Sequence, residues 1–377
     1  MVDATVLHKR VGQPDLPPPA SEVGIVGWLY KNLFSSPLNI ILTVASLAII
    51  YLMVPPFLDW AIFSANWQAG TSRETCVDPA TTTIEGACWT MVRARFGQFI
   101  YGRYPIDERW RVDLVMILQF AAIAALLIER VPGKKYAAIF LFVIYPVLAY
   151  FLLFGGFGLA IAETYLWGGL FLNIILGTVG IVASLPIGIV LALGRRSKLP
   201  VIRLLCIAFI ELVRGVPLIT VLFMASVMLP LFLPEGVTFD KLMRAMIGIA
   251  LFSAAYMAEV VRGGLQGIPK GQYEGAMALG LNYWKMMVFI VLPQALRIVI
   301  PGIVNTFIGL FKDTTLVTII GLFDFLGFAQ LATRDAEWQG LAKEGYVFVA
   351  FGFFIFCFSM ARYSIYLERK LHTGHRR

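Results

Sequence analysis

Charge is scarce in this chain of 377 residues: Asp, Glu, Lys and Arg make up 14% of it, against 59% hydrophobic residues. Soluble globular domains carry about 25% charged and about 45–50% apolar residues. The shortage of charge excludes a soluble globular protein, and the excess of apolar residues excludes an intrinsically disordered chain. We interpret the sequence as an all-α, polytopic membrane protein, in which each helical span takes about 20 apolar residues.

Catalytic and metal-binding patterns are missing as well. All three His residues lie in polar segments near the chain ends, so no Ser/His/Asp or Cys/His set can be assembled. The chain has no GxxxxGK[ST] phosphate-binding loop, no HExxH and no CxxC. We therefore predict a non-catalytic chain with no metal site and no cofactor of its own. We assign its net charge of +8 to loops at a lipid membrane, not to nucleic-acid binding.

Cysteine is rare, with four residues. Cys206 and Cys357 lie within apolar runs, and we expect them to be core residues. Cys76 and Cys88 lie twelve positions apart in one polar loop. If that loop faces an oxidising compartment, a disulfide between them is expected.

About eight apolar segments are candidate transmembrane helices. The predicted spans are 38–58, 113–128, 136–155, 170–194, 201–233, 243–262, 296–323 and 345–366. The fifth is broken near Gly215 and Pro217, so it is also compatible with an interfacial helix followed by a span.

These spans divide the chain into a three-span N-terminal extension and a five-span core. The predicted parts are a cytoplasmic tail with an interfacial helix (1–37), the extension (38–165) with its polar loop (61–112), the core (166–370) and a cytoplasmic tail (371–377). Nineteen of the 31 Lys and Arg residues then fall on the side of both termini and ten on the other. Because cytoplasmic loops are rich in Lys and Arg, we expect both termini in the cytoplasm and the loop 61–112 outside.

One cytoplasmic segment, 263–295, is neither wholly apolar nor disordered in its composition. We expect a short helix there, with Pro269 before it and Glu274 near its start, where an acidic side chain suits the helix dipole. Small side chains at Gly275, Ala276 and Gly280 allow another protein surface to approach closely. An ordinary interfacial helix is the alternative.

The spacing of this segment resembles the coupling motif of ABC-importer permeases: Glu-Ala-Ala, three residues, Gly, nine residues, Ile, one residue, Leu-Pro. The matching residues here are Glu274, Gly275, Ala276, Gly280, Ile290, Leu292 and Pro293, with Gly275 as the one departure. Further stretches resemble the branch that imports polar amino acids, namely 211–218, 256–264, 292–295 and 312–316. The long form of the chain resembles the M-type subunit of general L-amino acid importers of Gram-negative bacteria.

The resemblance implies a permease subunit of an ATP-driven importer in the bacterial inner membrane, working by alternating access. It also implies four kinds of partner: a second, related permease subunit forming a heterodimer, two copies of a cytoplasmic ATPase, a periplasmic amino-acid-binding protein, and membrane lipid. ATP and Mg would be bound by the ATPase, against which the coupling motif would dock.

Charged residues at membrane depth are costly unless paired or hydrated, so each suggests a function. Lys312 and Asp313 interrupt the seventh span and match the two ends of a zwitterion, with Lys312 for the α-carboxylate and Asp313 for the α-ammonium. Unwound backbone there would complete a substrate site, with Thr314, Thr315 and Asn305 as polar lining residues. Thr and Asn also form hydrogen bonds between membrane helices, which is the alternative role of these three residues. A salt bridge that only shapes a kink is the alternative for Lys312 and Asp313.

Two further sets of charges have a spacing of three residues. Glu211 with Arg214, and Glu259 with Arg262, can each form an ion pair on one helix face. We predict structural pairs at the cytoplasmic ends of their spans.

Two other functions compete with the importer subunit. A self-sufficient secondary transporter or channel often has two similar halves, and we find no such echo between 1–165 and 165–370. A membrane scaffold without a transport path would not explain Lys312 and Asp313 within a span.

Overall fold

The computed structural model describes residues 24–79, 83–234 and 239–371. Parts of the two predicted tails, 1–23 and 372–377, lie outside the described residues together with His8, His372 and His375. Within the described residues, regular secondary structure is helical apart from three isolated β-bridges, which confirms the predicted fold class. The α-helices are α1 (Gly24–Leu33), α2 (Pro37–Leu58), α3 (Trp89–Tyr101), α4 (Arg109–Leu127), α5 (Lys134–Ile139), α6 (Tyr145–Phe154), α7 (Gly169–Arg195), α8 (Pro200–Arg214), α9 (Leu218–Phe223), α10 (Lys241–Gln266), α11 (Lys270–Ala278), α12 (Tyr283–Met286), α13 (Leu292–Ile298), α14 (Ile300–Asp313), α15 (Phe325–Arg334) and α16 (Ala342–Leu371).

Some of these helices continue into π- or 3₁₀-helical turns. The longer ones are π-helices η1 (Asp59–Phe63), η4 (Phe140–Ile144), η6 (Met224–Met228) and η8 (Met287–Val291), and 3₁₀-helices η7 (Leu229–Phe232) and η9 (Thr314–Ile320). Shorter 3₁₀ turns are η2 (Arg73–Cys76), η3 (Ile106–Glu108), η5 (Thr164–Leu166) and η10 (Ala336–Trp338).

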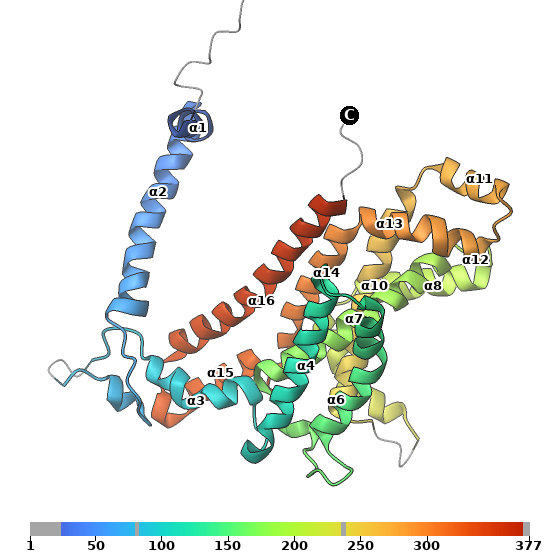
Figure 1. Cartoon of the computed structure of the whole chain (residues 1–377). Helices are drawn as coiled ribbons and strands as arrows, with labels where there is room; N and C mark the ends of the chain where they lie inside the picture. The colour runs from blue at the N-terminus through green and yellow to red at the C-terminus, as the bar shows by residue number, and fades with distance from the viewer. Residues whose placement is uncertain (1–23, 80–82, 235–238, 372–377) are drawn as a thin grey trace, which may run out of the picture. The chain divides into compact units, whose positions relative to one another are not determined.

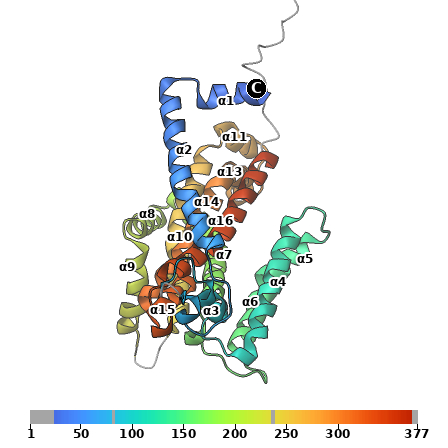
Figure 2. The same cartoon turned by 90° about the vertical axis from the view of Figure 1, so that its left-hand side faces the viewer.

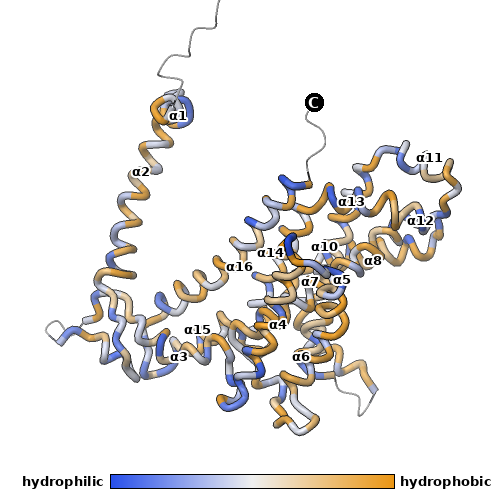
Figure 3. The backbone as a smooth tube through the Cα atoms, in the orientation of Figure 1, coloured by the Kyte–Doolittle hydropathy of each residue, from blue (hydrophilic) through white to orange (hydrophobic). Residues whose placement is uncertain are grey.

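Seven helices in the described part of the chain are long and apolar enough to cross a membrane, or eight if one bent pair is a single span. The bent pair is Pro200–Arg214 and Leu218–Phe232, which meet at 105°. The break falls at Gly215 and Pro217, where the sequence predicted it. Figure 3 shows hydrophobic residues along the long helices and hydrophilic residues in connections such as that before α5.

The chain forms two compact units, and the smaller contains α1 and α2 with residues 77–87. The Ser36 hydroxyl accepts from the backbone N–H of Asn39 and so caps α2, with Pro37 in its first turn. The Thr43 hydroxyl donates to the Leu33 carbonyl at 2.9 Å and ties α2 to the end of α1. Figure 1 shows α2 as one long helix that continues into η1.

The larger unit contains 67–76 and 88–377, and α7 and α10 form its centre. Glycines let α7 approach its neighbours: a Cβ at Gly188 would lie 2.7 Å from the Met257 Cβ of α10. A Cβ at Gly177 would lie 2.9 Å from the Phe311 ring of α14. Small residues at such contacts are how membrane helices gain van der Waals packing where no hydrophobic effect drives them together.

Two spans of the N-terminal extension, α4 and α5–α6, belong to the larger unit and lie side by side (Figure 2). Polar contacts join them to each other and to the core. The Gln119 amide of α4 donates to Thr178 of α7 at 2.5 Å, and the Tyr145 hydroxyl donates to Gln119 at 2.9 Å. Near the α4–α5 connection, Glu129 pairs with Lys370 of α16 and accepts from Tyr366 at 2.5 Å.

The loop predicted at 61–112 is more ordered than a polar connector, because it contains α3. Figure 1 shows α3 beside α15, and the Phe99 ring contacts Phe325 edge-on at 6.3 Å. The structure joins Cys76 and Cys88 by a disulfide, with Cα atoms 5.7 Å apart. The Cys88 N–H donates to the Glu344 carboxylate of α16 at 3.2 Å, so the disulfide lies at the α15 end of the larger unit.

Candidate functional site

The seventh predicted span changes its helical type at the charged pair. The α-helix α14 ends at Asp313, and the 3₁₀-helix η9 follows to Ile320, where Gly321 ends it in the left-handed region at φ +78°. The sequence predicted an unwound segment here, and the structure instead has a tighter helix. A 3₁₀ run of seven residues exceeds the usual three or four and is a frequent mark of a functional hinge.

Opposite faces of α14 differ in polarity. Ile303, Leu310 and Phe311 are buried, the last two against α7. Asn305 and Lys312 share the opposite face, seven residues apart, and both are exposed. Gly309 lies between them, and a Cβ added there would meet nothing within 4 Å. The helix therefore presents a polar stripe, Asn305–Gly309–Lys312, in the middle of a candidate span.

Lys312 and Asp313 lie at the end of this stripe. Lys312 is exposed and Asp313 half-buried. Among the described residues neither has an ion-pair partner, and they do not pair with each other. The kink-shaping salt bridge that the sequence left open is therefore not formed, and both charges are available to a ligand.

The two threonines after the pair both form hydrogen bonds within the protein. Thr314 is fully buried, and its hydroxyl accepts from Asn173 at 2.8 Å and donates to the Phe311 carbonyl at 2.7 Å. The Thr314 side chain therefore makes the contact between helices that the sequence offered as the alternative to substrate binding. The half-buried Thr315 donates to the Lys312 carbonyl at 2.9 Å.

A buried polar cluster around Asn173 and Asp324 was missed from the sequence. The Asn173 amide of α7 donates to Asp324 at 2.8 Å, and its carbonyl oxygen accepts from the Phe325 N–H at 2.9 Å. Asp324 caps α15 by accepting from the Gly327 N–H at 2.9 Å. Burial raises the pKa of Asp324, opposed by the hydrogen bonds from Asn173, Gly327 and Thr318. An Asp before an apolar run is a capping signal, but sequence alone does not place Asn173 beside it.

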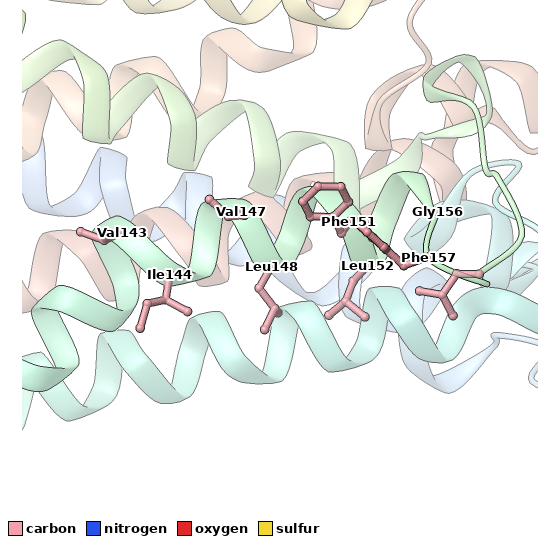
Figure 4. Close-up of a pocket in the computed structure, with 9 residues that line it drawn as sticks. Val143, Ile144, Val147, Leu148, Phe151, Leu152, Gly156 and Phe157 are labelled. Atoms are coloured by element: carbon pink, nitrogen blue, oxygen red, sulfur yellow. The ribbon is translucent and has the colours of Figure 1, made fainter.

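A groove along η4 and α6, with a volume of about 510 Å³, offers no polar site (Figure 4). Its lining is apolar, and Figure 4 shows Ile144, Leu148 and Leu152 along it. With no charged group, it cannot recognise a zwitterion, and its chemistry fits hydrocarbon.

The segment matching the coupling motif forms α11, whose N-cap residue is Pro269. Figures 1 and 2 show α11 and α15 at opposite ends of the larger unit. Glu274 is the fifth residue of the helix and not in its first turn, so the expectation that it meets the helix dipole is wrong. Glu274 and Gly275 are exposed, and Glu274 has no ion-pair partner among the described residues.

The remaining motif positions shape the segment. Gly280 has φ +72°, its N–H donates to the Met277 carbonyl, and the Leu281 N–H donates to the Ala276 carbonyl. This pattern is a Schellman cap, which favours Gly because of the left-handed backbone. Ala276 is 3% exposed and belongs to the core cluster with Met287, so it supports α11 from below and is not part of an exposed docking surface.

The end of the motif forms the turn back into the core. Ile290 lies in η8, and its carbonyl accepts from the Gln294 amide at 2.8 Å. Leu292 begins α13, and Pro293 occupies the first turn, where a missing N–H costs nothing.

The four charged residues predicted as structural pairs lie in one network, with one pairing different from the prediction. Arg262 pairs with Glu259 at 2.7 Å, as predicted. Glu211 does not pair with Arg214: it pairs with Arg195 at the end of α7, at 2.8 Å. Arg195 also reaches Glu259 at 2.8 Å, and Arg214 lies 3.9 Å from Glu259. Tertiary packing thus places Arg195 of α7 beside Glu211, in the position that the sequence had assigned to Arg214.

Next to this network, Arg196 links α7 to α11. Its guanidinium lies over the Tyr273 ring, 5.9 Å from the ring centre, and donates to the Leu265 carbonyl at 3.1 Å. The helix of the motif is thus attached to the ends of both α7 and α10.

Comparison with known proteins identifies the family. The family model described as "Binding-protein-dependent transport system inner membrane component" matches residues 184–373. The chain is 53% identical over 349 residues to the inner membrane amino-acid ABC transporter permease protein YhdY of Escherichia coli K12, covering 92% of this chain and 93% of YhdY. It is 41% identical over 424 aligned positions to the glutamate/glutamine/aspartate/asparagine transport system permease protein BztC of Rhodobacter capsulatus, covering 96% of each.

A shorter relative matches the core. The glutamate/aspartate import permease protein GltK of Escherichia coli O157:H7 is 32% identical over 211 residues, which are 55% of this chain and 93% of GltK. A chain from the crystal structure of an amino acid ABC transporter with histidines is 27% identical, covers 54% of this chain and 92% of its own length, and has a TM-score of 0.48. The chain under study therefore belongs to the family of binding-protein-dependent transport system inner membrane components, as a multi-pass, non-catalytic permease of an ABC transporter.

Proposed function

We propose that this chain is one of two membrane-spanning subunits of an ATP-driven importer that carries polar L-amino acids across a Gram-negative inner membrane. The names of YhdY and BztC, which align along nearly the whole chain, support amino acids as the substrate class. The names of BztC and GltK favour acidic amino acids and their amides.

The observation that carries the proposal is the polar stripe on α14. An Asn and a Lys on the surface of a span would face hydrocarbon if the chain worked alone, which costs several kcal/mol. A second permease subunit that covers the stripe, with a hydrated path between the two chains, removes that cost. The partner is best supplied by a related permease, forming a heterodimer.

Lys312 and Asp313 are the proposed substrate contacts on this path. The Lys312 ammonium donates hydrogen bonds to the α-carboxylate, and the Asp313 carboxylate accepts them from the α-ammonium. Neither has an ion-pair partner among the residues that the structure describes, which supports this role, because a pair satisfied inside the protein could not exchange its bonds for those of a substrate.

The segment α11 is the proposed contact with the ATPase, of which two copies bind ATP and Mg. Glu274 and Gly275 form its exposed face, while Ala276 and Gly280 hold its shape. Arg196 and Tyr273 pass a movement of α11 to α7. Both termini then lie in the cytoplasm with α11, and the Cys76–Cys88 disulfide and α15 face the periplasm and its binding protein.

The experiment is purification of the tagged chain in mild detergent from its native membrane, with partners identified by mass spectrometry, followed by reconstitution. We expect a P-loop ATPase and a second permease, and uptake of radiolabelled L-glutamate or L-glutamine only with ATP and a binding protein. Uptake by the chain alone, driven by an ion gradient, would replace the proposal by a secondary transporter.

A further inference from the structure

The hydrogen bonds around Asn173 and Asp324 hold the 3₁₀-helix that follows the charged pair at two positions, Thr314 and Thr318. At the beginning of η9, the Asn173 amide donates to Thr314 at 2.8 Å. Four residues on, Thr318 donates to Asp324 at 2.8 Å, and Asp324 also accepts from Asn173 at 2.8 Å. Asn173, Thr314 and Asp324 are each 0% exposed.

The cluster joins elements that are far apart in the sequence. Asn173 lies on α7, Thr314 on η9, and Asp324 at the start of α15. The backbone supports the same junction, because the Gly169 N–H of α7 donates to the Phe323 carbonyl at 3.1 Å. A Cβ at Gly168 would lie 2.6 Å from the same Phe323 oxygen, so the two segments meet at backbone distance. The cluster of Asn173, Thr314 and Asp324 therefore joins α7, η9 and α15 inside the larger unit.

The same cluster holds the residue that follows the end of α14. Thr314 is the residue at which α-helical bonding gives way to 3₁₀ bonding, and it directly follows Asp313. With its hydroxyl fixed between Asn173 and the Phe311 carbonyl, the last turn of α14 has a defined orientation. Lys312 and Asp313 belong to that turn, and within the described part of the chain neither has an ion-pair partner to orient it.

We propose that Asn173 and Asp324 are positioning residues for the substrate site: through Thr314 and Thr318 they set the orientation of Lys312 and Asp313. This inference rests on the proposed function, because it assigns the cluster to the substrate site named there. Displacement of binding groups by about 1 Å can change a rate about a hundredfold, so a buried contact that never touches substrate can control the rate of transport.

The test compares substrate uptake with ATP hydrolysis by the same complex, because misplaced substrate contacts lower uptake while a purely structural defect lowers both rates. Asn173→Leu removes the side-chain hydrogen bonds to Thr314, Asp324 and the Phe325 N–H. Ser184→Ala is the matched control, because Ser184 is a buried residue of the same helix whose hydroxyl donates only to the Ile181 carbonyl. Uptake of L-glutamate and hydrolysis of ATP are measured in liposomes with equal amounts of assembled complex and saturating binding protein. We expect Asn173→Leu to change the ratio of the two rates about tenfold, with Ser184→Ala within twofold of the wild type.

A purely structural role would give a different result. If Asn173→Leu assembles and slows both rates equally, the positioning role is overturned. Should Asn173→Leu fail to assemble, Thr318→Val removes one hydroxyl at nearly constant volume and Thr318→Ser keeps it. We expect Thr318→Val to shift the ratio and Thr318→Ser to restore it; an unchanged ratio in both contradicts the inference.

The same assay separates this inference from the proposed function. If Asp313→Asn abolishes uptake while Asn173→Leu transports with an unchanged ratio, the substrate site stands and the positioning role falls. If Asp313→Asn transports normally, the proposed site itself is wrong.

Discussion

Two groups of charged residues at the membrane helices of this permease differ in how they are satisfied. At the ends of α7, α8 and α10, Glu259 is 16% exposed and has three Arg side chains within 4 Å. On α14, Lys312 and Asp313 have no ion-pair partner among the described residues. Since a charge in a low-dielectric setting must be compensated, the first group stabilises the fold, and the second needs a partner from outside the chain.

The largest effect is expected when the negative charge of Asp313, which has no ion-pair partner among the described residues, is removed. Asp313→Asn keeps the shape of the side chain but loses the charge that would bind the α-ammonium. We expect uptake to fall about a hundredfold, the typical effect of truncating one partner of a desolvated charge pair, while complex assembly and melting temperature remain unchanged. Asn305→Ala on the same stripe is the control. Normal uptake with Asp313→Asn would place the substrate site elsewhere.

The second prediction concerns Glu259, the carboxylate at the centre of the paired group. Glu259→Gln leaves Arg195, Arg214 and Arg262 close together, so we expect a loss of about 3 kcal/mol in the free energy of unfolding. Glu211→Gln is the matched control, because Glu211 is 54% exposed and its pair with Arg195 contributes at most about 1 kcal/mol. Thermal unfolding of the purified complex measures both. Equal effects of the two variants would contradict the central place of Glu259.

The third prediction concerns Glu274, an exposed residue of α11 that has no ion-pair partner among the described residues. Glu274→Lys reverses an exposed charge, so the permease should fold normally while its affinity for the ATPase falls about tenfold, as for a charge at an interface. The measurement is the amount of ATPase that co-purifies at increasing salt, with Lys270→Glu as a second reversal on the same helix. Wild-type binding by Glu274→Lys would remove Glu274 from the interface.

The smallest effect is expected at Glu129, a paired charge outside the spans. Hydrogen bonds from Lys370 and Tyr366 lower the pKa of the Glu129 carboxyl. A carboxyl with a lowered folded-state pKa stabilises the fold above its ordinary value and loses this contribution as the pH falls through the folded value. Thermal unfolding should therefore show a slight loss of stability below about pH 4.5 that Glu129→Gln lacks. Identical pH profiles would show that the pair contributes nothing.

Much of the fold follows from composition and local pattern. Long apolar runs predicted the spans, and Gly215 with Pro217 predicted the break between α8 and α9, because Pro cannot continue a helix. The first part of the motif, up to Gly280, predicted a short helix, and the left-handed cap explains why Gly stands there. These features depend on residues close in sequence, so the sequence alone was enough for them, and the comparisons confirm the family it indicated.

Side-chain partners were not predictable in the same way. The spacing in the sequence predicted an ion pair between Glu211 and Arg214. In the structure α7 packs beside α8, and Glu211 forms its ion pair with Arg195 instead. Thr314 looked like a substrate contact because it follows Lys312 and Asp313, but Asn173, 141 positions earlier, takes its hydroxyl. Partners of this kind are chosen by which helices touch, a property of the whole fold.

The sequence by itself therefore determined the membrane class, the break between α8 and α9, the cap of α11 and the place of the two charges within α14. Each follows from backbone preferences or from the cost of charge in hydrocarbon, both of which act locally. Only the tertiary structure decided which charges are satisfied and which are free. Burial and pairing depend on contacts between α7, α10 and α14, and close approach at glycines such as Gly177 and Gly188 makes those contacts possible.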